Sequence, residues 1–249
     1  YEIPKRDWSS DVCSSDLMSR PTLVLLPGLL NTRRLFEHQI AALSDICDII
    51  VPELHHYDTL GAMAEAALEA APPRFALAGF SMGGYVAFEI LRRAAHRVER
   101  LALIDTQATP DRPEAMARRR GFIEQTKIGR FHGVQPALLP QIVHRARLND
   151  PAVVQPILDM ALEVGAEGFV REQTAILGRP DSRHLLVEVE VPTVVMVGRQ
   201  DQTTPLPRSQ EMAADVANAR LVVFEECGHM APLEKPAEVS AELRRWLAQ

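Results

Sequence analysis

Phe75-Ala-Leu-Ala-Gly79-Phe80-Ser81-Met82-Gly83-Gly84-Tyr85 joins an apolar run to a serine between glycines and then to a helix-like segment. The unbroken apolar run at its start is typical of a parallel strand that is covered on both faces. From Tyr85 onward, large apolar residues mix with alanine and arginine, which favours a helix. The sequence therefore predicts a sharp turn from strand to helix, with Ser81 at its tip.

Gly79-Phe-Ser81-Met-Gly83 is a G-x-S-x-G sequence. In a sharp strand-to-helix turn of this kind, the serine hydroxyl points out of the sheet edge, and a Cβ at the flanking positions would clash with neighbouring backbone. The pentapeptide alone also fits an ordinary glycine-rich turn. The strand before it and the helix after it favour a nucleophilic Ser81, with the Met82 N–H placed to stabilise a negative oxygen.

Composition and charge argue against several classes of protein. The 249 residues are 47% hydrophobic and carry a net charge of −6, without a basic cluster suited to nucleic acid. No apolar run reaches the length of about 18 residues that a membrane-spanning helix needs. The three cysteines, Cys13, Cys47 and Cys227, have no metal-binding spacing and form no even disulfide framework. We therefore expect a cytoplasmic protein with a small-molecule partner, without nucleic acid or membrane binding.

The first 17 residues look foreign to the rest of the chain. They show no hydrophobic periodicity, and the segment 7–17 resembles the in-frame translation of a sequencing adapter. No charged stretch precedes an apolar core, so the segment is not a secretory signal. We interpret 1–17 as a non-native, disordered tail and Met18 as the native start.

Short apolar runs alternate with helix-like segments along most of the chain, which predicts a mostly parallel α/β sheet with helices on both faces. Six runs are expected to form strands, at 22–27, 46–51, 75–78, 98–105, 191–198 and 219–224.

The pattern changes between residues 106 and 186, where β-rich runs are missing. Helix-like segments occupy 111–127, 136–147, 151–162 and 167–177. A single crossover needs only about a dozen residues, so an insertion of about 80 residues favours a helical cap, although ordinary crossover helices are the alternative. The predicted core is thus 18–105 with 187–249, and the cap is 106–186. Its candidate pocket-lining residues, each of which also fits a core position, are Phe122, Phe131, Leu138, Leu139 and Met160.

Three polar residues, Ser81, Asp201 and His229, come just after the ends of predicted strands. In an open α/β sheet, ligands bind outside the carboxyl ends of the strands. A serine needs a base such as imidazole, and the imidazole needs an acceptor on its other nitrogen. Asp201 suits that role, and Asp105, which also ends a strand, is the alternative. Past the first strand, Pro27-Gly28 is expected to present the Leu29 N–H to the same cleft, although an ordinary turn is also compatible.

The adjacent histidines His55 and His56 raise the possibility of a metal site. Successive residues are expected to point in different directions, and no further ligand stands at a motif spacing. We therefore predict no metal site.

These motifs together resemble the α/β-hydrolase superfamily from Pro21 to Gln249. Leu26-Pro27-Gly28-Leu29 resembles its oxyanion loop, and Gly79 to Gly83 its nucleophile elbow. Gly198-Arg-Gln-Asp201 resembles its acid loop, and Cys227-Gly-His229-Met its histidine loop. The chain departs from the family pattern in lacking the first two strands, which leaves six, and in reading Leu-Pro-Gly where many relatives have His-Gly.

The resemblance implies a serine hydrolase that cleaves a small or medium carboxylic ester, with Ser81, His229 and Asp201 as the triad and Leu29 and Met82 as oxyanion donors. It implies neither a metal nor an organic cofactor. Carbon–carbon bond hydrolases, lactonases and perhydrolases of the superfamily share the triad and remain alternatives. A protein that keeps the fold but only binds a ligand is the alternative from another class.

Overall fold

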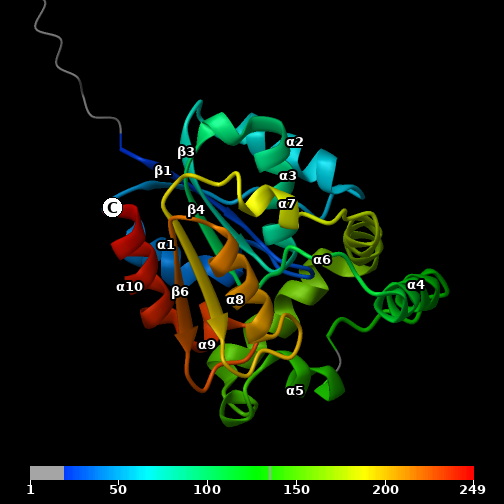
Figure 1. The fold of residues 1–249 in the computed structure, drawn as a ribbon. Helices are drawn as coiled ribbons and strands as arrows, with labels where there is room; N and C mark the ends of the chain where they lie inside the picture. The colour runs from blue at the N-terminus through cyan, green and yellow to red at the C-terminus, as the bar shows by residue number, and fades with distance from the viewer. Residues whose placement is uncertain (1–19, 135) are drawn as a thin grey trace, which may run out of the picture.

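The computed structural model describes residues 20–134 and 136–249, so the predicted tail, 1–17, lies outside the described residues. Its centre is a six-stranded sheet in which every neighbouring pair runs parallel, in the order β2-β1-β3-β4-β5-β6 (Figure 1). The strands are β1 (Thr22–Leu26), β2 (Asp48–Ile50), β3 (Phe75–Phe80), β4 (Val98–Ile104), β5 (Thr193–Gly198) and β6 (Ala219–Phe224). The predicted six-stranded parallel sheet is confirmed.

Helices cover both faces of this sheet. One face packs against α2 (Leu60–Ala70), α3 (Met82–Ala94), α7 (Arg183–Leu186) and α8 (Leu206–Asp215). The other packs against η1 (Arg33–Phe36), α1 (Glu37–Leu43), α9 (Ala231–Glu234) and α10 (Pro236–Leu247). The remaining helical turn of the core is η2 (Ala95–Arg97).

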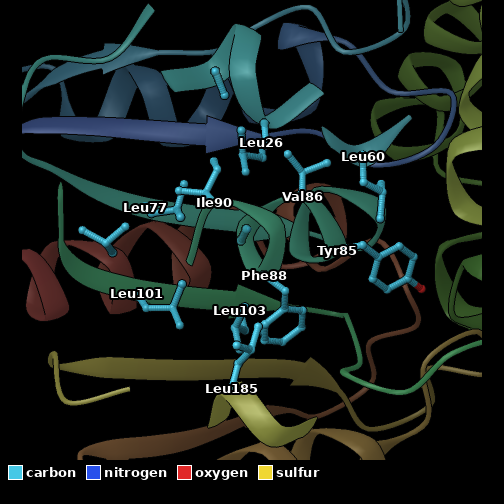
Figure 2. Close-up of a cluster of buried hydrophobic side chains, with 14 of the residues drawn as sticks. Leu26, Leu60, Leu77, Tyr85, Val86, Phe88, Ile90, Leu101, Leu103 and Leu185 are labelled. Carbon is cyan, nitrogen blue, oxygen red and sulfur yellow. The ribbon is translucent and has the colours of Figure 1, made fainter. Parts of the chain in front are cut away.

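The two cores follow from the alternation of side chains along each strand. In β1, Leu23 and Leu25 belong to one cluster, whereas Val24 and Leu26 belong to the other. Figure 2 shows the cluster between the sheet and α3, where side chains from β1, β3 and β4 face Val86, Phe88 and Ile90. Because strands in the middle of the sheet are buried on both faces, their sequences are continuous apolar runs.

Between β4 and β5 the chain is helical. Its elements are α4 (Pro113–Lys127), η3 (Pro136–Leu138), α5 (Leu139–Ile142), η4 (Arg145–Arg147), α6 (Pro151–Leu177) and α7. The predicted helix at 136–147 is wrong, because this segment forms three short pieces with Pro136 and Pro140 at or near their starts. The two helices predicted at 151–162 and 167–177 meet in α6 at Gly165, whose φ of 69° interrupts the helical backbone.

The long helix α6 also contacts the segment that follows β1. The Thr32 N–H donates to the Met160 sulfur at 3.4 Å, and the Thr32 hydroxyl donates to Glu163 at 3.2 Å. Arg34 forms an ion pair with Asp159 at 3.1 Å. Helix α6 is therefore tied to the loop that the sequence predicts to hold an oxyanion donor.

Candidate active site

Ser81 lies at a sharp turn between β3 and α3. Its backbone has φ 51° and ψ −113°, a strained conformation for a residue with a side chain. The Ser81 N–H donates to the Ile104 carbonyl at 2.9 Å, and the Thr106 hydroxyl donates to the Ser81 carbonyl at 2.7 Å. Contacts from the end of β4 thus hold the serine in this conformation.

The glycines around Ser81 are required by close backbone contacts. A Cβ on Gly83 would lie 2.1 Å from the Leu26 carbonyl oxygen, and one on Gly79 would lie 2.5 Å from the Gly83 oxygen. Neither contact leaves room for a side chain, because both neighbouring atoms belong to backbone. Helix α3 can therefore start directly after Ser81 and pass close to β1.

Ser81, His229 and Asp201 form a chain of hydrogen bonds. The Ser81 Oγ lies 2.9 Å from His229 Nε2, and His229 Nδ1 lies 2.8 Å from Asp201 Oδ2. Both His229 and Asp201 are 4% exposed. The three residues follow β3, β5 and β6, whose carboxyl ends meet at one edge of the sheet. The structure thus brings together the three residues that the sequence selects.

Several donors fix the Asp201 carboxylate. The Thr203 and Thr204 N–H groups donate to Oδ1 at 2.8 and 2.9 Å, and the Thr204 hydroxyl donates to Oδ2 at 2.7 Å. Burial by itself raises the pKa of Asp201, but the His229 charge and the hydrogen bonds from His229 and Thr204 outweigh it and leave the pKa below its ordinary value. Asp201 therefore stays ionised and can orient the imidazole.

Asp105, the alternative acid, has a different set of partners. Its Oδ1 accepts the Gly198 N–H at 2.9 Å, and its Oδ2 accepts the Ala231 N–H at 3.1 Å. Burial, followed by the charge of Asp201, raises its pKa well above the ordinary value. Asp105 ties the end of β4 to β5 and to the segment after His229, and its described hydrogen bonds do not include His229.

Glu234 supports the histidine loop and was not selected from the sequence. Its Oε1 accepts the N–H groups of Gly228 and Met230 at 3.0 and 3.1 Å, so the carboxylate binds the residues directly before and after His229. Its Oε2 accepts the His144 N–H at 2.8 Å. The sequence around Glu234 gave no signal for this role, because the bonds depend on the turn that α9 makes.

Two backbone N–H groups near Ser81 are available to a ligand. The N–H groups of Leu30, Asn31 and Thr32 donate to Glu172, to the Gly28 carbonyl and to Met160. Within the described residues, the Leu29 N–H has no acceptor, and neither does the Met82 N–H at the start of α3. These are the two donors that the sequence predicts for an oxyanion.

A groove of about 640 Å³ lies beside these loops, with Gln202 and Thr203 of the Asp201 loop in its wall. The groove is lined by Arg112, Arg118, Arg119 and Arg208, and by two acidic residues, Asp111 and Glu114. Asp111 is already paired with Arg119 at 2.6 Å and with buried Arg179 at 2.8 Å. Arg112 and Arg118 have no carboxylate partner in the described part of the chain, and Glu114 has no cationic one there. With four arginines against two acidic residues, the lining of the groove is electropositive.

The five predicted pocket-lining residues do not line this groove. Leu139 and Met160 are buried in the core on the α1 side of the sheet, and Phe122 is 43% exposed. Phe131 packs against the cluster of Leu30, Ala161 and Val164, as Leu29 also does. For Leu139 and Met160 the core alternative therefore holds, because apolar character does not distinguish core positions from pocket positions.

Two further groups, Cys227 and the pair His55 and His56, lie outside the hydrogen-bonded chain of Ser81, His229 and Asp201. Burial raises the pKa of the Cys227 thiol, so it packs as a small apolar group. His55 and His56 do not diverge as expected, since their rings lie 4.1 Å apart and their ligand atoms lie within 4.8 Å of those of Glu53. That cluster is separate from Ser81 in the sequence and lies in the loop before α2.

In residues 20–134 and 136–249, no helix has the length and apolar character needed to cross a bilayer.

Comparisons with known proteins find esterases among the proteins that this chain resembles. The chain is 29% identical over 244 residues to pimeloyl-[acyl-carrier protein] methyl ester esterase of Aromatoleum aromaticum, an alignment covering 89% of this chain and 96% of the relative. An esterase from Thermogutta terrifontis, solved with malate bound, superposes with a TM-score of 0.84 at 29% identity, covering 92% of this chain and 90% of the other. The enol-lactonase from Burkholderia xenovorans has the same fold, with a TM-score of 0.80 at 23% identity and coverage of 93% and 92%.

The model of the alpha/beta hydrolase family matches residues 23–242, which include all of the sheet except Thr22 and all the loops described above. The relatives reported above are esterases and a lactonase, so hydrolysis is the chemistry common to them. This chain belongs to the alpha/beta hydrolase family.

Proposed function

We propose that this protein is a serine hydrolase that cleaves small or medium carboxylic esters. The observation that carries the proposal is the hydrogen-bonded chain from Ser81 through His229 to Asp201, with distances of 2.9 and 2.8 Å. These distances suit proton transfer from the serine to the imidazole. The free Leu29 and Met82 N–H groups supply the second requirement of acyl transfer, an oxyanion site.

In the first half of the reaction, Ser81 Oγ attacks the ester carbonyl carbon while its proton passes to His229 Nε2. The carbonyl oxygen becomes an oxyanion that accepts hydrogen bonds from Leu29 and Met82. When the tetrahedral intermediate collapses, the bond to the alkoxy oxygen breaks, and His229 Nε2 gives its proton to that oxygen. An alcohol leaves and the acyl group remains on Ser81.

In the second half, water attacks the acyl carbonyl and passes a proton to His229 Nε2. Collapse of the second intermediate returns that proton to Ser81 Oγ and releases a carboxylic acid. Throughout, His229 Nδ1 donates its hydrogen to Asp201 Oδ2, which leaves Nε2 as the basic nitrogen. The low pKa of Asp201 keeps the acceptor charged and stabilises the imidazolium when it forms.

The two esterases among the similar proteins support ester cleavage. The esterases of Aromatoleum aromaticum and Thermogutta terrifontis are each 29% identical to this chain and align over most of both chains. The lactonase is less similar, at 23% identity, and supports the fold alone.

The electropositive groove supports a substrate that carries a negative group away from the ester. A carboxylate placed near Arg112 and Arg118 would find cations without an acidic partner. The half-ester of a dicarboxylic acid fits this description. A neutral ester of the same length would gain nothing from the arginines.

The proposal is tested by labelling with a fluorophosphonate, followed by mass spectrometry, beside a chain-length series of p-nitrophenyl esters. One adduct on Ser81, with turnover that Ser81→Ala abolishes, is the expected result. An adduct without turnover of any ester would move the assignment to carbon–carbon bond, lactone or peracid chemistry. The absence of any adduct would favour a protein that only binds its ligand.

A further inference from the structure

The loop that carries Leu29 has an unfavourable backbone at the next residue. The Asn31 N–H donates to the Gly28 carbonyl at 3.1 Å, which closes a four-residue turn with Leu29 and Leu30 at its centre. Leu30 has a φ of 59°, in the left-handed region. Turns with a positive φ at the third residue usually place glycine or asparagine there, because a branched side chain is strained.

Rotating the Leu29–Leu30 peptide by half a turn would remove this strain. Such a flip converts the turn to a form in which its third residue has negative φ, the conformation that a leucine prefers. It also exchanges the positions of the Leu30 N–H and the Leu29 carbonyl. The observed orientation therefore needs an interaction that stabilises the Leu30 N–H in the direction in which it now points.

Glu172 of α6 supplies that interaction. Its Oε2 accepts the Leu30 N–H at 2.9 Å, and the residue is 0% exposed. Its Oε1 is also buried and has no hydrogen-bond partner in the described part of the chain. Burying a carboxyl group with one backbone contact is costly, and the fold alone gives no reason for it. The hydrogen bond between Leu30 and Glu172 also joins two parts of the chain that are far apart in sequence, the loop after β1 and the helical region between β4 and β5.

We propose that Glu172 is a positioning residue that holds the turn from Gly28 to Asn31, and with it the Leu29 N–H, in the conformation needed for oxyanion binding. This inference rests on the proposed function, because it assigns a role in the same ester cleavage. Oε2 accepts the Leu30 N–H in this form of the turn, and after a flip that N–H would lose this acceptor. The turn is thereby kept in the strained form, and the adjacent Leu29 N–H stays directed toward the site.

The protonation state of Glu172 is compatible with this role. Burial raises its pKa to about 8, opposed by the Leu30 N–H and by the charge of Arg171. At pH 7 the group is therefore mostly protonated and uncharged. A neutral acceptor can hold the peptide without placing a negative charge beside an oxyanion that forms on the same loop.

The test compares two substitutions of similar volume. Glu172→Gln keeps a carbonyl oxygen for the Leu30 N–H, whereas Glu172→Leu removes the acceptor. The matched control is Glu167→Leu, on the same helix, where the wild-type side chain is exposed and pairs only with Arg171 at 3.4 Å. For each protein, kcat and KM are measured on p-nitrophenyl butyrate, with the inhibition constant of a boronic acid that forms a tetrahedral adduct on Ser81.

We expect Glu172→Leu to lower kcat by about tenfold or more, to weaken boronic acid inhibition by a similar factor and to leave KM within about twofold. Glu172→Gln should retain most of the activity, and Glu167→Leu should match the wild type. The inference is overturned if Glu172→Leu retains wild-type kcat, or if the loss lies in KM with kcat unchanged. It is also overturned if Glu172→Gln loses as much as Glu172→Leu.

Folding and function are separated by two further measurements. Thermal melting identifies a variant that does not fold, and in that case Glu172→Met repeats the comparison with a more adaptable side chain. Wild-type protein that neither reacts with a fluorophosphonate nor turns over an ester would refute the proposed function itself. Active wild-type protein beside an equally active Glu172→Leu would refute only the role of Glu172.

Discussion

Replacing Glu172 by glutamine should remove a specific pH dependence from the stability of the protein. The pKa of Glu172 rises from 4.5 to about 8 on folding because the side chain is buried. Between these values the folded protein keeps a proton that the unfolded chain releases, so the free energy of unfolding falls as pH rises through this window. The contribution is fully present below pH 4.5 and is lost above the folded pKa.

The size of the effect follows from the same shift. At about 1.4 kcal/mol for each pH unit, a rise from 4.5 to about 8 corresponds to a loss of at most about 5 kcal/mol. About 3 kcal/mol of this is lost by about pH 6.5. Glutamine cannot titrate, so the stability of Glu172→Gln relative to wild type should increase by these amounts between about pH 4.5 and 8.

Urea unfolding of both proteins at about pH 5, 6.5 and 8 measures this difference directly. Titrations elsewhere in the protein, such as that of Asp105, are common to both and cancel. Glu167→Gln, at an exposed position of α6, serves as the control and should follow the wild type at every pH. A difference between Glu172→Gln and wild type that stays constant across the window would refute the reasoning, because it would mean that Glu172 titrates normally in the folded protein.

Four further substitutions test the remaining contacts. Asp201→Asn should lower kcat on p-nitrophenyl esters by about 10³ to 10⁴ through loss of the charged acceptor, and a loss below about tenfold would contradict its role. Gly83→Ala should lower the unfolding free energy by about 3 kcal/mol or more, because the added Cβ would lie 2.1 Å from a backbone oxygen; wild-type melting would count against the close contact. Glu234→Ala should destabilise the protein and lower kcat by leaving three backbone N–H groups without an acceptor, at about 1 to 3 kcal/mol each, with urea unfolding and ester kinetics as readouts. Arg118→Gln should lower kcat/KM about threefold to tenfold for a dicarboxylate half-ester but not for a neutral ester, whereas Arg120→Gln, exposed on the same helix, should change neither.

The sheet and the location of the site could be predicted because both follow from local patterns. Continuous apolar runs identify buried parallel strands, and such strands bring the residues after them to one edge. For this reason Ser81, Asp201 and His229 could be grouped although they lie far apart in the sequence. The distinction between Asp201 and Asp105 needed the structure, because both follow a buried strand.

The contacts from the helical region could not be predicted, since they depend on how it packs on the core. Nothing near Glu172 in the sequence indicates that its carboxyl group lies against Leu30, which is 142 residues away. The left-handed backbone of Leu30 gave no signal either, because such positions are usually recognised by glycine or asparagine. Pro140 is different: a proline inside a predicted helix is a local sign of interruption, and the helix expected at 136–147 conflicts with it.

The ties between α6 and the loop after β1 limit how the protein can be re-engineered. A common way to change the substrate of such an enzyme is to exchange the helical region for that of a relative. Here, an exchanged segment would have to supply equivalents of Asp159, Met160 and Glu163, which contact Thr32 and Arg34 from α6. A graft without them would alter the oxyanion loop together with the pocket, so selection for a new substrate would act on the rate of the chemical step as well as on recognition.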